Sequence, residues 1–99
     1  MNEFFEDLGR RWVEAAARQG VEIDQPLLDS DLAAELLELA RVAAHTQERR
    51  FAPLASFMAG VAVERLRAAS ERSGIQPSSG ELAAYVREVR QELEPEAPA

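Results

Sequence analysis

The chain contains neither cysteine nor lysine among its 99 residues. Without cysteine, a disulfide scaffold, a thiolate zinc site and a cysteine nucleophile are all excluded. No apolar run approaches the 18 residues of a membrane-spanning helix, and the first twelve residues lack the apolar stretch of a signal peptide. We therefore expect a cytoplasmic protein that does not contact membranes.

Residues that favour strands are also scarce. Hydrophobic residues make up 46% of the chain but aromatic residues only 6%, and alanine is the most frequent hydrophobic type, which favours closely packed helices over a sheet. The length suits one small core. We predict an all-α fold, a compact bundle of four main helices forming a single domain over residues 1–94, with a disordered tail over residues 95–99.

The charge is strongly acidic. Eleven arginines stand against eighteen acidic residues, which gives a net charge of −7. Such a chain repels phosphate backbones at long range, so a general nucleic-acid-binding function is excluded. Residues 51–79 differ from the rest, because three arginines there outnumber two glutamates. An anion is therefore favoured only in this central region.

Hydrophobic spacing predicts helices over about 2–19, 30–50, 53–72 and 79–93. Gly20 and Gly74 follow the last periodic residues of the first and third helices, where glycine commonly ends a helix. Ser78 and Glu81 have the spacing of a capping box for the fourth helix. For the third helix, the predicted core stripe consists of Leu54, Phe57, Met58, Val61 and Ala62.

Several large apolar residues receive separate predictions. Trp12 lies in the middle of the first stripe, so we expect it to be buried against the third and fourth helices. Phe4, Phe51 and Val63 lie off the main stripes, and we expect them to be exposed and used for self-association or for a partner.

A polar segment spans the end of the second helix and the start of the third. On a helical wheel its side chains lie opposite the apolar stripe, and His45 is the sole histidine. One interpretation is an anion site, in which cationic side chains join the N-terminus of the third helix. The other is an ordinary solvated face whose charges pair locally. The candidate binding residues are Arg41, His45, Glu48, Arg49, Arg50 and Pro53.

Chemistry beyond binding is not expected at this segment. His45 and Glu48 have a spacing used in bundle metal sites, but such sites need several glutamates and a second histidine. No catalytic set has a known spacing, so we expect no enzyme, metal or cofactor. His45 is expected to be accessible and hydrogen-bonded to Glu48 or Glu38.

The region from Leu36 to Gly60 carries the pattern L-L-x-L-A-R-x-x-A-H-x-x-E-R-x-x-A-P-L-x-x-F-x-x-G. In this pattern the chain resembles a small bacterial helical domain of unassigned function. That domain occurs alone, or fused or adjacent to the molybdenum cofactor guanylyltransferase, which attaches a guanine nucleotide to molybdopterin.

The resemblance implies a non-catalytic accessory or interaction domain associated with molybdenum cofactor biosynthesis. Its expected partner is the guanylyltransferase, and a homodimer is a further possibility. The alternative is a module that binds a small anion, a nucleotide or pterin phosphate, at the corner between the second and third helices.

Overall fold

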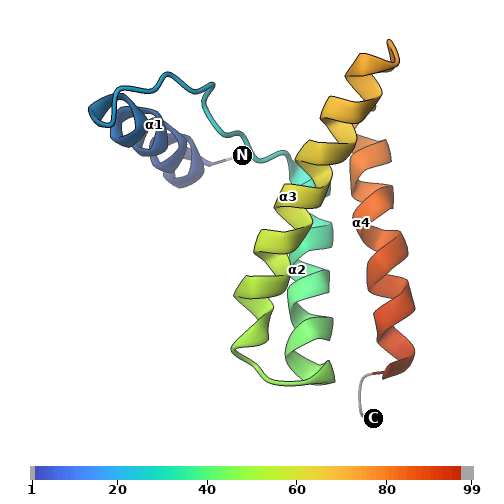
Figure 1. Cartoon of the computed structure of the whole chain (residues 1–99). Coiled ribbons are helices and arrows are strands. Elements are labelled where there is room, and N and C mark those ends of the chain that lie inside the picture. The colour runs from blue at the N-terminus through green and yellow to red at the C-terminus, as the bar shows by residue number, and fades with distance from the viewer. Residues whose placement is uncertain (1, 97–99) are drawn as a thin grey trace. The chain divides into compact units, whose positions relative to one another are not determined.

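A computed structural model describes residues 2–96, and its regular structure is entirely helical within this range (Figure 1). This confirms the predicted all-α class. No helix among the described residues has the length and apolarity needed to cross a membrane. The elements are α1 (Glu3–Arg18), α2 (Ser30–Thr46), α3 (Phe51–Arg72), α4 (Ser79–Leu93) and a 3-10 helix, η1 (Glu94–Glu96).

The chain divides into two compact units, one ending at Ser30 and one beginning at Asp31. In the first unit, the irregular segment after α1 returns across that helix at Gly9, which is buried. A Cβ atom on Gly9 would lie 2.7 Å from the carbonyl oxygen of Pro26. The Gln25 Nε2 atom donates to the carbonyl oxygen of Glu6 at 3.3 Å. Gly9 thus provides the space that the returning backbone occupies.

The prediction that Trp12 is buried is wrong, because this side chain is 57% exposed. Phe4, Phe5 and Leu8 on the same helix are exposed as well. Within its own unit, α1 has no second helix against it, and the narrow irregular segment at Gly9 leaves most of the indole uncovered.

Both predicted glycine stops are confirmed. Gly20 and Gly74 have φ values of 82° and 77°, a region that side chains disfavour. Beyond them, the N–H of Val21 donates to the carbonyl oxygen of Ala16 at 3.0 Å, and the N–H of Ile75 donates to that of Ser70 at 2.8 Å. These bonds satisfy carbonyl groups that the helix ends leave open.

The second unit is a bundle of α2, α3 and α4 around one apolar core. Its buried centre consists of Leu32, Leu39, Val63, Leu82 and Val86. Val63 is 2% exposed, so the prediction that it lies on the surface is wrong. The expected exposure of Phe4 and Phe51 is confirmed.

The predicted core stripe of α3 is wrong at its three largest side chains, while Val61 and Ala62 are half-buried. Leu54, Phe57 and Met58 are 62%, 72% and 71% exposed, while Ala59 and Val63 face the core. α3 therefore has two apolar faces, and the one with the smaller side chains is buried. Small side chains let helices approach closely, which favours this face at a three-helix contact.

The helix boundaries near the candidate site differ slightly from prediction. α2 ends at Thr46, before the expected 49–50, and α3 begins at Phe51, two residues before Pro53. Residues 95 and 96, expected in a disordered tail, belong to η1. Residues 97–99 of that tail lie outside the described range.

Candidate functional site

The predicted site lies at the corner where α2 leads into α3. His45 is near the end of α2, Glu48, Arg49 and Arg50 form the turn, and Pro53 is in the first turn of α3. All four of the polar side chains are exposed. The chain therefore brings these residues together by sequence proximity, without a contribution from a distant element.

His45 is accessible, as predicted, but its hydrogen-bond partner differs from the prediction. Its Nδ1 atom lies 2.7 Å from the carbonyl oxygen of Arg41, one turn earlier in α2. A carbonyl oxygen only accepts, so Nδ1 carries the hydrogen in this bond. The partner is thus the helix backbone rather than Glu48 or Glu38, because the ring folds back along its own helix.

The arginines of the site point to different partners. Arg41 pairs with Glu38 at 3.0 Å and approaches Glu94 at 4.0 Å, which draws it towards the end of α4. Arg50 pairs with Glu48 at 3.2 Å. Arg41 and Arg50 therefore pair with different carboxylates, and Arg49 is exposed and forms no ion pair within residues 2–96.

The start of α3 offers an anion fewer N–H groups than the sequence indicated. The N–H of Phe51 donates to the carbonyl oxygen of Glu48 at 2.9 Å, and that of Ala52 donates to Arg49 at 3.2 Å. Pro53 has no N–H. An anion-binding helix start depends on such free donors, so this geometry gives the anion hypothesis little support. No cluster of potential metal ligands occurs among the described residues.

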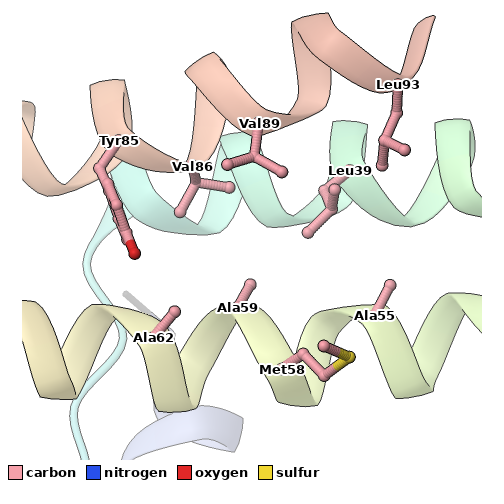
Figure 2. Close-up of a pocket in the computed structure, with 9 residues that line it drawn as sticks. All are labelled: Leu39, Ala55, Met58, Ala59, Ala62, Tyr85, Val86, Val89 and Leu93. Carbon is pink, nitrogen blue, oxygen red and sulfur yellow. The ribbon is translucent and has the colours of Figure 1, made fainter.

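A second feature of the same unit is an apolar groove between α3 and α4 (Figure 2). Its volume is about 260 Å³. Tyr85, Val89 and Leu93 project from α4 into the space between the two helices. The remaining lining residues are Leu39, Ala55, Met58, Ala59, Ala62 and Val86.

The groove opens directly onto the core. Leu39 and Val86, which line it, are buried members of the core cluster. The apolar surface continues towards the α2–α3 corner, where Thr46, Phe51 and Leu54 line a further hollow. The corner predicted from sequence is thus the end of a longer apolar surface.

Sequence comparison supplies the family. A family model, "Domain of unknown function (DUF6457)", matches residues 6–98. The chain belongs to the DUF6457 family. This confirms the predicted domain of unassigned function and says nothing of molybdenum cofactor assembly. No curated protein and no solved structure matches the chain.

The DUF6457 chain also contains an ion-pair network that spacing did not reveal. Glu35 of α2 accepts from Arg87 at 3.0 Å and from Arg90 at 3.3 Å. Arg90 also pairs with Glu94 at 2.6 Å, and this hydrogen bond raises the pKa of the Arg90 guanidinium. The side chains of Glu35 and Arg90 are each 13% exposed, so the network joins α2 to α4 at a largely covered position.

The groove residues of this DUF6457 domain carried only a faint sequence signal. On α3 they are Met58 and the alanines at 55, 59 and 62, and this spacing is common to the buried faces of helices. On α4, however, Tyr85, Val89 and Leu93 widen the stripe beyond the buried residues Leu82, Ala83 and Val86. That extra width was the available indication of a second apolar contact.

Proposed function

We propose that this DUF6457 domain is a non-catalytic interaction module whose α3–α4 groove receives an amphipathic helix of a protein partner. The supporting observation is the groove itself, an apolar hollow whose lining includes the core residues Leu39 and Val86. Apolar surface that remains open to water is a common mark of a protein-binding site. Helix-in-groove recognition uses this kind of surface.

The dimensions of the groove favour a helix as the occupant. From Ala55 to Ala62 along α3 the wall rises about 10 Å, and from Tyr85 to Leu93 along α4 it rises about 12 Å. Two turns of a helix have this length. The alanines at 55, 59 and 62 leave room for the backbone of an incoming helix, since helices pack closest across small side chains.

The charge of the domain indicates the polar character of that helix. Glu88 and Glu92 are exposed on α4 beside the groove residue Val89. The whole chain carries a net charge of −7. We call Glu88 and Glu92 the acidic rim of the groove. A partner helix with basic residues along the edge of its apolar face would complement this acidic rim and associate faster at low salt.

The named candidate for the partner is the molybdenum cofactor guanylyltransferase. What supports this choice is the resemblance of the segment from Leu36 to Gly60 to a domain found beside or fused to that enzyme. The proposal gives the present chain no catalytic residue: its role is to hold or position the partner.

The test is a titration of purified guanylyltransferase with the wild-type domain and with Ala62→Trp, followed by calorimetry. The indole fills the groove from its α3 side, so binding should weaken by about tenfold or more. Phe57→Ala, on the exposed face of α3 outside the main groove, is the control and should bind like the wild type.

A variant of the acidic rim tests how much charge contributes to partner binding, apart from the shape of the groove. The double variant Glu88→Gln with Glu92→Gln should weaken binding at low salt and have less effect at high salt, because the rim charges are exposed and screened. Absence of binding by the wild-type domain would remove the guanylyltransferase as partner. Binding that Ala62→Trp leaves unchanged would remove the groove as the site.

A further inference from the structure

α3 carries a second exposed apolar surface, opposite its buried face. At 100° per residue, its residues fall in one stripe on the far side of the helix from Val63. Phe57, Val61, Arg65 and Ala68 line one shallow hollow together with Gly60. We call this surface the outer ridge, and it consists of the exposed residues Leu54, Phe57, Arg65 and Ala68 and the half-buried Val61.

We propose that the outer ridge pairs with the outer ridge of a second copy of this chain, with the two α3 helices antiparallel about a two-fold axis at Val61. This inference is independent of the proposed function, which uses the groove on the side of α3 that faces α4. A closed pair of this kind uses the same surface on both copies, so each contact occurs twice.

The order of side chains along the ridge is self-complementary in this arrangement. Positions equally distant from Val61 face each other, so Leu54 meets Ala68 and Phe57 meets Arg65. The first pair sets a large side chain against a small one. The second sets a guanidinium on an aromatic ring, which is an attractive contact.

A parallel arrangement lacks this complementarity. Each residue would then face the same residue of the second chain. Arg65 would therefore lie against Arg65, which places two like charges side by side. The small Ala68 side chains would face each other and leave a gap. The sequence of the ridge therefore selects the antiparallel pairing.

The Arg65 guanidinium can contact a phenylalanine ring of the second chain only if no carboxylate already holds it. Within residues 2–96 it forms no ion pair, whereas its neighbour Glu64 pairs with Arg67 at 2.7 Å. Arg65 lines the same hollows of the α3 surface as Phe57 and Val61. The guanidinium is thus available to a ring of the second copy.

The dimer should have a low affinity, and this affinity should depend on the salt concentration. One helix ridge per copy covers an area at or below the low end of stable interfaces, about 1,200 Å² in total, so we expect dissociation in the micromolar range. Each copy carries a net charge of −7, and salt screens this repulsion. The dimer should therefore become stronger as salt increases.

Cysteine crosslinking tests the register, because the natural chain has no cysteine. Under mild oxidation, Val61→Cys should form a covalent dimer, since the two thiols meet at the axis. Leu54→Cys alone should remain uncoupled, whereas a mixture of Leu54→Cys and Ala68→Cys chains should crosslink. Crosslinking of Leu54→Cys with itself, or failure of Val61→Cys to crosslink, would overturn the proposed pairing.

Sedimentation at 1 to 100 μM tests the pairing without any crosslink. Val61→Glu places two carboxylates at the axis and should give a monomer, while Leu37→Glu, which adds the same charge at an exposed side chain of α2 outside both surfaces, should dimerise like the wild type. A wild-type monomer at 100 μM, or a Val61→Glu dimer as strong as the wild type, would refute the proposal. Val61→Glu should leave guanylyltransferase binding intact and Ala62→Trp should leave dimerisation intact, so this proposal and the proposed function fail separately.

Discussion

The bundle of α2, α3 and α4 has a closed side, where its apolar side chains are buried, and an open side, where apolar side chains are exposed. On the closed side, Leu39, Val63 and Val86 are buried and Glu35 joins Arg90 across the helices. On the open side, the α3–α4 groove and the outer ridge expose larger side chains, among them Phe57, to water. The contrast teaches that the size of an apolar side chain does not decide whether it is buried in this bundle.

The largest difference in stability is expected between two single variants, one with a charge on the closed side and one with a charge on the open side. Val63→Asp puts an unpaired carboxylate in the closed core, at a cost of several kcal/mol, comparable to the whole stability of a domain of this size. We expect the second unit to unfold, seen as loss of helical circular dichroism. Val61→Asp, two residues away on the open side, should remain helical. Equal loss in both variants would mean that the ridge is also part of a core.

A smaller effect is expected when an ion pair is broken, and its size should differ between the covered pair of the closed side and an exposed pair. Glu35→Ala leaves the largely covered Arg90 without its α2 partner and should lower the melting temperature by several degrees. Glu64→Ala breaks the exposed pair with Arg67, and such pairs contribute little, so the melting temperature should hardly change. Similar shifts for the two variants in thermal melts would show that the Glu35 network contributes no more than a surface pair.

Two glycines extend the comparison to covered and uncovered helix positions. Gly60→Ala should stabilise α3 by about 1 kcal/mol, because no atom lies within 4 Å of the added Cβ. Gly9→Ala gains the same helix propensity, but its Cβ would meet the Pro26 carbonyl oxygen. We expect faster hydrogen exchange over residues 20–29 in that variant. Unchanged exchange there would show that the irregular segment does not rest on Gly9.

The smallest effect is a dependence on pH at the start of α4. The backbone N–H of Ser78 donates to the Glu81 carboxylate at 3.0 Å, and this hydrogen bond lowers the pKa of Glu81. The stability that this gives is present above the ordinary glutamate pKa, about 4.3, and disappears as the pH falls through the lower folded-state pKa. Glu81→Gln should therefore melt slightly below the wild type at pH 7 and level with it near pH 2. A constant difference at both pH values would exclude the carboxylate as the cause.

Local rules predicted the parts of this fold that depend on neighbouring residues. The helix ends at Gly20 and Gly74 and the capping box of Ser78 and Glu81 follow from residue types within a few positions of each other. The buried face of α3 does not, because both of its faces are apolar. The choice of Ala59 and Val63 over Phe57 was made by the packing of α2 and α4, which no local pattern records.

The candidate site divides in the same way. The accessibility of His45 was predictable from the helical wheel, and its bond to the Arg41 carbonyl is a contact within one helix. The partners of Glu35 are 52 and 55 residues away, so spacing gave no sign of them. The groove likewise appears only when alanines of α3 meet the wide stripe of α4.

The two-faced α3 has a consequence for how this family can change over time. Leu54, Phe57 and Val61 lie on the outer ridge, while Ala59 and Val63 hold the helix in the bundle. Mutations at the first three positions can therefore alter recognition with little loss of stability, whereas most mutations at the last two are removed by selection for folding. One helix thus separates the residues free to evolve new specificity from those that preserve the fold.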